Sequence, residues 1–272
     1  MEVYFDKTYA RGFGTYPLKG SDLQQAVSHA LHTGYRAFDT AQMYENEHDL
    51  GVALAVSGID RGDLLITTKV HPDHYKRDDF FRSLERSLSS LRLDQLDVVL
   101  LHWPPIGGEI APSLRLLAEA KKQGLTKHIG VSNFTSTMLR QAKQIIDERI
   151  VVNQVEFHPL LDQSSLLNAS RETGIRLASY CSVARGEILK YPLLAEIGKK
   201  YGKSPVQVAL RWILQKGVSI NTMSTNPDNI KANFDIENFV LNEAEMDSID
   251  CLNRANYRIV YKGIVPWVPE WD

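Results

Sequence analysis

Apolar and polar positions along the chain follow two alternating patterns. Eight short runs are rich in β-branched and aromatic residues, as buried strands are, and they cover residues 12–15, 37–40, 64–70, 97–102, 128–132, 151–157, 176–181 and 218–223. Longer stretches with helical periodicity lie between them, among them residues 21–33, 77–91, 114–122, 135–146 and 204–215. This alternation predicts parallel strands that are covered by helices.

Residues at the ends of the amphipathic stretches support these helices. Ser21, Thr135 and Ser204 stand at helix starts and are predicted as N-caps, because a hydroxyl oxygen accepts a bond from an N–H group of the first turn. Glycines that follow the stretches and precede strands are predicted as left-handed helix ends; they are Gly34, Gly124, Gly174 and Gly217.

Eight strand–helix units of similar length, with no linker between them, predict one α/β domain over residues 1–272, a (β/α)8 TIM barrel. The tail, residues 253–272, is expected near the barrel mouth. The competing topology is an open, doubly wound sheet with a glycine-rich dinucleotide turn after its first strand. The run Gly12-Phe13-Gly14 lacks the third glycine of that turn, which favours the barrel.

Composition and charge narrow the class of partner. The chain carries 31 Lys and Arg against 33 Asp and Glu, so no net field attracts nucleic acid or an anionic membrane. Only Cys181 and Cys251 are present, no apolar segment follows Met1, and no run is long enough to span a bilayer. We expect a cytoplasmic protein that acts on a small molecule. The sequence does not fix the oligomeric state, and a monomer is compatible with it.

Polar side chains gather where the predicted strands end, and the carboxyl ends of barrel strands carry the chemistry of such folds. These positions hold Asp39 with Tyr44 beyond it, Lys69, His102-Trp103, Ser132-Asn133, Gln154, Glu156, Tyr180 and Ser224. A lysine at the mouth of a strand buried on both faces is destabilised unless a carboxylate such as Asp39 pairs with it.

The Asp39 and Lys69 positions allow two interpretations. The two residues could form a purely structural ion pair, and His102 could be a core histidine with satisfied hydrogen bonds. In the catalytic interpretation, the Lys69 ammonium lowers the pKa of the Tyr44 phenol, so that Tyr44 gives up a proton near neutral pH. His102 would orient a substrate carbonyl and stabilise the developing oxyanion, which suits carbonyl reduction.

Five segments with matching order and spacing resemble the aldo-keto reductases, in particular bacterial members like the diketogluconate reductases. They are residues 34–47, 68–70, 101–104, 130–134 and 153–156. The resemblance implies an NAD(P)H-dependent oxidoreductase that reduces aldehydes or ketones. It also implies a catalytic tetrad, which consists of Asp39, Tyr44, Lys69 and His102, with Tyr44 as the general acid.

The resemblance further implies a cofactor extended across the barrel mouth, either NADPH or NADH. Ser132, Asn133 and Gln154 would hold the nicotinamide carboxamide, and Tyr180 would stack on the ring. The other implied cofactor contacts are Gly14, Thr15, Asp39, Val183, Arg185, Ser224, Asn229 and Asn233. Arg185 could equally be a solvated loop residue. A helix starting near Pro227 would turn backbone N–H groups toward an anion.

The cofactor segment departs from the family pattern at several positions. Met223 and Asn229 stand where NADPH-binding members usually have lysine and arginine, the cations that hold the 2′-phosphate. The run Cys181-Ser182-Val183 replaces the more usual Ser-Pro-Leu. We therefore expect a weak or reversed preference for NADPH.

Aromatic residues near the predicted mouth are candidates for a substrate-binding wall. Tyr16, His71 and Trp103 are expected to form an aromatic wall around the substrate. The tail aromatics Tyr261, Trp267 and Trp271 are either core residues or part of this wall.

Other chemistries are less well supported by the sequence. His71 and His74 lack a third ligand at a recognisable spacing, so no metal site is predicted. Ser132 is not in a G-x-S-x-G elbow, which argues against an acyl-transfer nucleophile. A cofactor-binding regulatory or redox-sensing subunit is the alternative to an enzyme.

Overall fold

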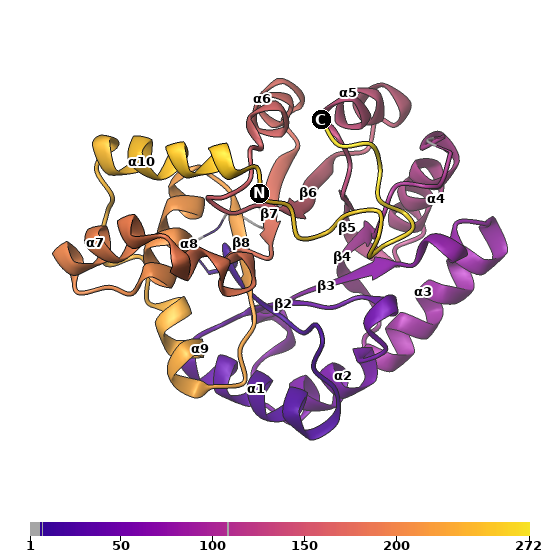
Figure 1. The fold of residues 1–272 in the computed structure, drawn as a ribbon. Helices are drawn as coiled ribbons and strands as arrows, with labels where there is room; N and C mark the ends of the chain where they lie inside the picture. Colours follow the sequence, from indigo (N-terminus) through magenta and orange to yellow (C-terminus); the bar gives the residue numbers. More distant parts are fainter. Residues whose placement is uncertain (1–5, 7, 108) are drawn as a thin grey trace.

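The computed structural model describes residues 6, 8–107 and 109–272, and its centre is a closed barrel of eight parallel strands in chain order (Figure 1). The strands are β1 (Arg11–Gly14), β2 (Ala37–Asp39), β3 (Leu65–Val70), β4 (Leu96–Leu101), β5 (Thr126–Ser132), β6 (Ile150–Glu156), β7 (Arg176–Tyr180) and β8 (Ser219–Thr222). All eight predicted strands are present. Because β1 pairs with β8 and closes the sheet, the TIM barrel is confirmed and the open sheet is excluded.

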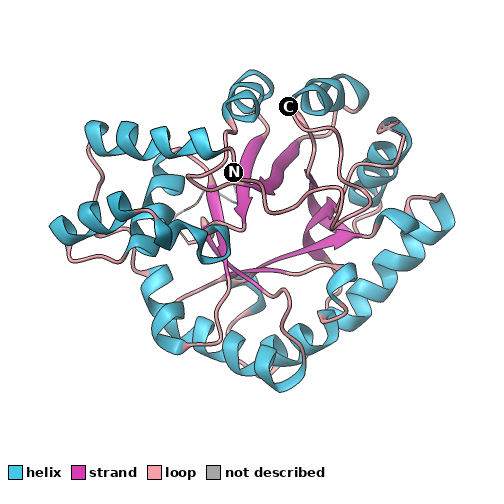
Figure 2. Ribbon diagram, viewed as in Figure 1, coloured by secondary structure: helices cyan, strands magenta, loops and turns pink. Residues whose placement is uncertain are grey.

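Helices form an outer ring around the strands, as Figure 2 shows. They are α1 (Gly20–Thr33), α2 (Glu47–Ala55), α3 (Arg77–Leu91), α4 (Ala111–Lys122), α5 (Ser136–Ile145), α6 (Ser164–Thr173), α7 (Pro192–Tyr201), α8 (Pro205–Gln215), α9 (Pro227–Phe234) and α10 (Glu243–Asp250). Short 3-10 helices join some of these elements; they are η2 (Gln42–Tyr44), η3 (Arg61–Asp63), η4 (Pro72–His74), η5 (Ala184–Lys190) and η6 (Cys251–Ala255). Within the described ranges, no helix has the length and apolar character needed to cross a membrane.

Two of the three predicted N-caps are confirmed. Ser204 forms a capping box with Gln207 at the start of α8, and the Thr135 hydroxyl accepts a bond from the N–H of Met138 at the start of α5. Ser21 is not a cap, because α1 begins one residue earlier. There the N–H of Gly20 donates to Asp49 Oδ2 at 2.6 Å, so a carboxylate from α2 replaces the local cap.

The glycines at the helix ends take the predicted conformation. Gly34 and Gly174 are the left-handed C-caps of α1 and α6, and Gly124 and Gly217 also have positive φ just beyond α4 and α8. The loops between helices and strands are therefore short, and each strand starts within two residues of the predicted position.

The inside of the barrel is packed with small and branched side chains rather than left open. A cluster of buried residues lines it: Ala37, Leu65, Val98, Leu100, Val152 and Ala178. Gly130 on β5 leaves room for two of them. A Cβ atom at this position would lie 2.5 Å from Leu100 Cδ2 and 2.8 Å from Val152 Cγ1.

Substituting Gly130→Ala is expected to destabilise the fold by about 1–3 kcal/mol, because overpacking forces neighbouring side chains or strands apart. Urea unfolding followed by circular dichroism measures the change in the free energy of unfolding. Gly62→Ala is the matched control, since the nearest atom to its Cβ would be Asp60 Oδ1 at 3.3 Å, at the end of a flexible side chain. Equal stability of both variants would contradict the packing argument.

Candidate active site

The carboxyl ends of β2 and β3 place a buried ion pair at the barrel mouth. Lys69 is almost fully buried, its ammonium forms an ion pair with Asp39, and it donates to the carbonyl oxygen of Thr40 at 2.9 Å. It also donates to the hydroxyl oxygen of Tyr44 at 3.3 Å. On the other side of the pair, Gln154 Nε2 donates to Asp39 Oδ2 at 2.7 Å. The predicted Asp39–Lys69 contact is present, and it includes the tyrosine.

The pKa of Tyr44 differs from the expectation. Burial raises the pKa of this phenol, the positive charge of Lys69 opposes that effect, and Asp39 adds to it, so the net pKa lies above its ordinary value. Lys69 acts in the predicted direction, but desolvation outweighs it. Burial also acts to lower the pKa of Lys69, yet Asp39 and Tyr44 hold it above its ordinary value. At neutral pH the site therefore holds a protonated phenol beside a charged ammonium.

His102 follows β4 and faces the same phenol. Its ring lies edge-on to the ring of Tyr44, with the centroids 5.5 Å apart. Burial, with the nearby charges of Lys69 and His71, lowers the pKa of His102 well below its ordinary value, so the imidazole is neutral. Nδ1 of His102 is buried and finds no hydrogen-bond partner among the described residues. A core histidine with satisfied hydrogen bonds is therefore not what the structure shows.

The residues expected around the nicotinamide carboxamide form one connected group at the ends of β5, β6 and β7. Ser132 Oγ donates to the carbonyl oxygen of Gln154 at 2.8 Å, and Asn133 Nδ2 donates to the carbonyl oxygen of His102 at 2.9 Å. The hydroxyl of Tyr180 donates to Asn133 Oδ1 at 2.7 Å. These contacts fix the orientation of polar groups that the sequence only placed at strand ends.

Gly14 and Thr15 lie next to the ion pair, as expected for residues at the end of β1. Gly14 pairs in register with Asp39, and the N–H of Thr15 donates to the Asp39 carbonyl oxygen at 3.0 Å. Their position at the mouth follows directly from the register between β1 and β2.

The segment after β8 contains the helix predicted near Pro227, but its free N–H groups are not available as expected. Asn226 caps α9, and its Oδ1 accepts from the N–H of Asp228 at 2.8 Å and of Asn229 at 3.3 Å. Ser224 Oγ in turn accepts from the N–H of Asn226 at 3.1 Å. The side-chain cap thus uses the donors that the sequence assigned to an anion. Met223 and Asn229 are exposed, and Asn233 is partly buried on α9.

The loop after β7 has an unusual backbone. Cys181, Ala184 and Arg185 all have positive φ, between 48° and 51°. Arg185 is exposed and Val183 is partly buried, so the arginine is placed at the surface of the mouth. Burial raises the pKa of the Cys181 thiol to about 11, and the charge of Glu156 adds to this shift.

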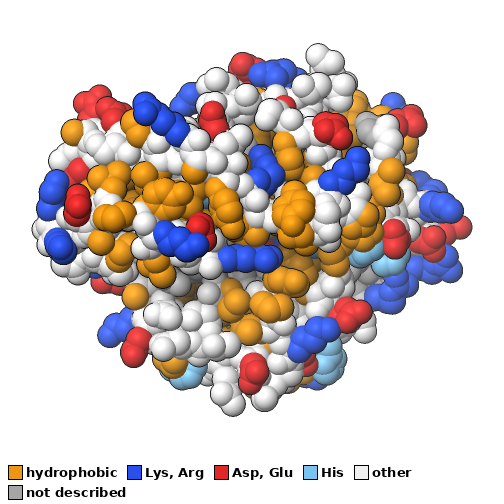
Figure 3. All heavy atoms as spheres, viewed as in Figure 1, with side chains coloured by type: hydrophobic (Ala, Val, Ile, Leu, Met, Phe, Trp, Pro, Cys, Tyr) orange, Lys and Arg blue, Asp and Glu red, His pale blue; other side chains and the backbone are white. Residues whose placement is uncertain are grey.

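Aromatic side chains surround the tyrosine and the histidine. Tyr16 is largely exposed, and its ring centroid lies 5.1 Å from that of Tyr44, while Trp103 stacks on His102 with the centroids 6.3 Å apart. His71 lies edge-on to Trp267 of the tail, with the centroids 5.0 Å apart. Figure 3 shows hydrophobic side chains gathered on this face of the molecule.

The tail residues contact this wall to different degrees. Trp267 and Trp271 are partly buried, and Trp271 lies 6.5 Å from Trp103 between ring centroids. Tyr261 is 53% exposed. The two tryptophans therefore contact the wall from the tail side, whereas Tyr261 is largely in solvent.

The tail is fastened to the barrel by contacts that the sequence analysis missed. Glu156, at the end of β6, is fully buried; its Oε1 accepts from the N–H of Ile259 at 2.7 Å and its Oε2 from the N–H of Val260 at 2.9 Å. His158 Nε2 lies 3.0 Å from the same Oε1. The sequence signal for this attachment is a glutamate at the end of an apolar strand. That signal does not show that its hydrogen-bond partners lie in the tail.

The last residue provides a second attachment. The N–H of Ser136 donates to Asp272 Oδ2 at 2.7 Å, and the Ser136 hydroxyl donates to Oδ1 at 2.9 Å. A carboxylate thus lies at the N-terminal end of α5, where the helix dipole favours negative charge.

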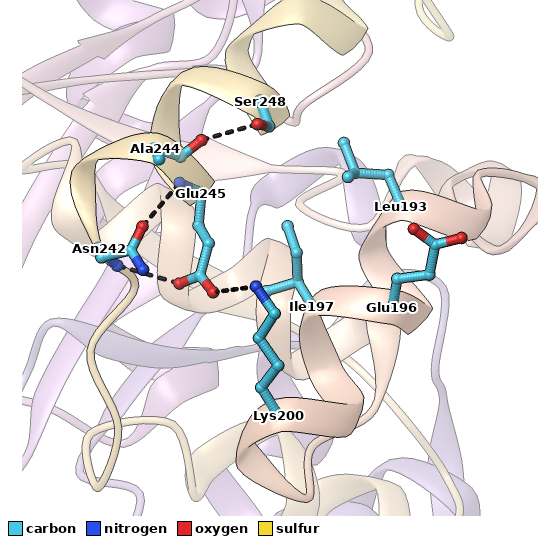
Figure 4. A pocket seen from close by; sticks show the side chains of 8 residues that line it. All are labelled: Leu193, Glu196, Ile197, Lys200, Asn242, Ala244, Glu245 and Ser248. Carbon is cyan, nitrogen blue, oxygen red and sulfur yellow. Dashed lines mark hydrogen bonds and ion pairs between the residues drawn. The ribbon is translucent and has the colours of Figure 1, made fainter.

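A separate cavity of about 240 Å³ lies between α7 and α10, away from the strand ends (Figure 4). Glu245, one of three charged residues that line it, already accepts from Lys200 Nζ at 3.0 Å and from the N–H of Asn242 at 3.0 Å. Among the described residues, no group of three or more His, Cys, Asp or Glu side chains is arranged to hold a metal ion. The buried polar groups at the barrel mouth are therefore the candidates for catalysis.

The fold is a closed parallel barrel whose mouth holds a tyrosine, a buried lysine–aspartate pair and a neutral histidine. The chain belongs to the aldo/keto reductase family, which it matches over residues 10–254. The predicted family is therefore confirmed, and the function class of the chain is carbonyl reduction by an oxidoreductase.

Known relatives cover nearly the whole chain. It is 37% identical over 266 residues to the methylglyoxal reductase DkgB of Escherichia coli O157:H7. The aligned region covers 97% of this chain and 98% of that protein. It is 40% identical over 249 residues to the 2,5-diketo-D-gluconic acid reductase B of a Corynebacterium species, covering 90% and 89% of the two chains. A crystal structure of a Bombyx mori aldo-keto reductase in complex with NADP matches with a TM-score of 0.87 at 29% identity and covers 96% of this chain and 95% of that chain.

The variant Glu156→Gln is expected to loosen the tail, because an amide NH2 would face a backbone donor that now bonds to a carboxylate oxygen. Loss of one buried hydrogen bond of about 1–3 kcal/mol should speed amide exchange at Ile259 and Val260 by roughly tenfold or more. Hydrogen–deuterium exchange measures this directly. Glu270→Gln, on an exposed tail carboxylate, is the control, and unchanged exchange in Glu156→Gln would show that the contact does not hold the tail.

Proposed function

We propose that this chain reduces aldehydes and ketones with NADPH or NADH and that Tyr44 donates the proton to the carbonyl oxygen. The observation that carries this proposal is the contact of the Tyr44 hydroxyl with the Lys69 ammonium, which is itself paired to Asp39. A protonated phenol next to a cation can release its proton when charge develops on a substrate oxygen, because the ammonium stabilises the phenolate that remains.

The proposed chemistry divides between cofactor and protein. A bound reduced nicotinamide would supply the hydride for the carbonyl carbon, and the carbonyl oxygen would take a proton as the C=O double bond becomes a C–O single bond. Tyr44 gives that proton and later recovers one from solvent. His102, neutral and with an unpartnered ring nitrogen, would hydrogen-bond the same oxygen and fix the direction of the carbonyl.

The residues at the strand ends fit a nicotinamide by the chemistry of their donor set. A carboxamide has one acceptor and two donors, and the hydroxyl of Ser132 with the side-chain amides of Asn133 and Gln154 offers both kinds of group. Tyr180 presents an aromatic ring beside them and is held by Asn133. We propose that these four residues bind and orient the nicotinamide, with Gly14, Thr15 and Asp39 at its edge.

The proposed substrate is a small carbonyl compound. The relatives named above carry the names of methylglyoxal and 2,5-diketo-D-gluconic acid, and both are small dicarbonyl compounds. Tyr16, His71 and Trp103 would enclose such a substrate together with Trp267 and Trp271 of the tail. Ring contacts join Trp267 to His71 and Trp271 to Trp103, which supports a contribution of the tail to this enclosure.

Substituting Tyr44→Phe should lower turnover by roughly 10²-fold or more and leave the fold and the cofactor Kd unchanged, because only the phenolic hydroxyl is removed and the ring remains. Turnover of 4-nitrobenzaldehyde is followed by absorbance at the nicotinamide band, and cofactor binding by fluorescence quenching. Tyr16→Phe is the matched control, since it removes a hydroxyl from the neighbouring ring. Near-normal turnover in Tyr44→Phe would contradict the assignment of Tyr44 as the general acid. No turnover in the wild type would favour a regulatory subunit.

The proposed cofactor preference rests on the segment after β8. Met223 and Asn229 replace the cations that usually hold a 2′-phosphate, and the cap by Asn226 occupies the N–H groups of Asp228 and Asn229. Lys231 is the remaining cation on this part of α9. A 2′-phosphate therefore meets few donors here, whereas the 2′-hydroxyl of NADH needs only neutral partners such as Ser224 or Asn229.

We expect the wild type to bind NADPH no more than weakly better than NADH, and the double variant Met223→Lys/Asn229→Arg to tighten NADPH by about 10²-fold, since charged hydrogen bonds contribute about 1.5–3 kcal/mol each. The ratio of Kd values for the two cofactors, measured by fluorescence quenching, tests this. NADH affinity should stay within about threefold as the internal control. A wild-type preference for NADPH above about 10²-fold that the double variant does not change would contradict this interpretation of the phosphate site.

A further inference from the structure

The proposed acid lies on a very short element, the 3-10 helix η2, of which Tyr44 is the last residue. This single turn has no side-chain cap at Ala41, and it ends at Glu45, whose φ is 53°. The N–H of Tyr44 donates to the carbonyl oxygen of Ala41 at 3.0 Å, and the N–H of Glu45 to that of Gln42 at 3.2 Å. Because an isolated 3-10 turn is unstable on such bonds alone, contacts from outside must hold the tyrosine in place.

The side chain of Tyr44 is itself held loosely. Its hydroxyl accepts from the Lys69 ammonium at 3.3 Å, which is longer than most N–H···O bonds. One of the rings beside it belongs to Tyr16, which is largely exposed. The bond to Lys69 therefore does not by itself fix the hydroxyl, and a small movement of the turn would break it.

Gln42, the first residue of the turn, makes the outside contacts through its side-chain amide. Its Oε1 accepts from the backbone N–H of His71 at 2.9 Å and lies 3.0 Å from Nδ1 of His74, and its Nε2 donates to Ser87 Oγ on α3 at 3.1 Å. A backbone N–H can only donate, so the orientation of the amide is determined, and His74 carries a proton on Nδ1. Both lone pairs of Oε1 are thus in use, and the turn is tied to η4 and to α3.

The same hydrogen-bond network continues to the strand that carries the ammonium. Ser87 Oγ donates to Glu47 Oε2 at 3.2 Å, and the hydroxyl of Thr68 donates to Glu47 Oε1. Ser87 and Thr68 are fully buried, and Thr68 precedes Lys69 on β3. Helix α2, which carries Glu47, lies beside α3 in the outer ring (Figure 1). The amide of Gln42 is therefore linked through two buried hydroxyls and one carboxyl group to β3.

We propose that Gln42 is a positioning residue for proton transfer: it holds the turn of Tyr44 against η4 and α3, so that the phenol hydroxyl stays beside the Lys69 ammonium. The proposal rests on the reductase function proposed above. Gln42 acts through Tyr44 and not on the substrate. Without its amide, the turn would depend on its own backbone bonds, and the hydroxyl would spend less time in the reactive position. A displacement of about 1 Å can lower a rate by about 10²-fold, so this loss should appear in kcat.

The variant Gln42→Met tests this, because it keeps the length of the side chain and removes its hydrogen bonds. Its kcat for 4-nitrobenzaldehyde, normalised to cofactor-binding sites, should fall roughly 10- to 100-fold, while the cofactor Kd stays within about threefold and KM within about fivefold. The solvent deuterium isotope effect on kcat should rise by about 1.5-fold or more, because proton transfer from a misplaced donor limits the rate. A purely structural role would lower the number of binding sites and leave kcat per site and the isotope effect unchanged.

Two further variants accompany it. Gln95→Met is the matched control, since the Gln95 side chain donates to the carbonyl oxygen of Gly124 at 2.7 Å just before β4, at the opposite end of the barrel, and its kcat should not change. Ser87→Ala removes the acceptor of Gln42 Nε2 and leaves the bonds of Oε1, so kcat should fall by a smaller factor, roughly three- to tenfold. If Gln42→Met does not fold, Ser87→Ala decides alone. A kcat within about twofold of wild type in either folded variant overturns the proposal.

Amide hydrogen exchange measures the turn without turnover, which separates this proposal from the proposed function. In Gln42→Met the N–H groups of Tyr44 and Glu45 should exchange roughly tenfold faster or more, because the turn opens more often. Gln95→Met should leave both rates at the wild-type value. Unchanged exchange at Tyr44 in Gln42→Met would overturn the proposal even if kcat falls. Faster exchange in a protein whose wild type reduces no aldehyde would reject only the reductase function.

Discussion

The buried charge of Lys69 is the constraint on which the barrel mouth depends. An ammonium inside a closed barrel is tolerated only with a carboxylate beside it, and Asp39 supplies this from the neighbouring strand. Asp39 is held in turn by Gln154, from β6 on the other side of the barrel. Closure of the sheet therefore brings together three residues that are far apart in sequence. The position of Tyr44 next to the ammonium follows from the direct pairing of β2 with β3.

Strand β6 connects the Asp39–Lys69 ion pair at the barrel mouth to the tail. Gln154 and Glu156 are two residues apart, so their side chains point to the same face of the strand. The first contacts Asp39, and the second holds the backbone of Ile259 and Val260. The two buried carboxylates are stabilised in different ways, since Asp39 pairs with a cation whereas Glu156 is surrounded by N–H donors. One rigid strand thus sets the distance between the proposed acid and the wall that faces it.

The sequence predicted the elements that depend on local periodicity and on strand ends. All eight strands were found, and the polar ends of β2, β3 and β4 placed Asp39, Lys69 and His102 together, because parallel strands in a barrel share one carboxyl edge. Contacts across long sequence separations were not predictable. Nothing near Glu156 shows that its partners lie in the tail, and nothing near Gly20 shows that Asp49 replaces a local cap.

The sequence also could not predict the outcome where two effects on one group oppose each other. The motif places a cation beside Tyr44, but the extent of its burial decides the direction of the pKa shift, and burial emerges only from the packed structure. Likewise, the sequence places free N–H groups at the start of α9, but the rotamer of Asn226 decides whether they remain free.

The attachment of the tail has a consequence for how enzymes of this kind diversify. Glu156 accepts hydrogen bonds from the backbone N–H groups of residues 259 and 260, and every amino acid except proline has such a group. Mutational drift in the tail can therefore replace side chains along the wall without detaching the segment. A fixed acidic residue on the barrel leaves an adjoining surface free to explore new ligands over evolutionary time.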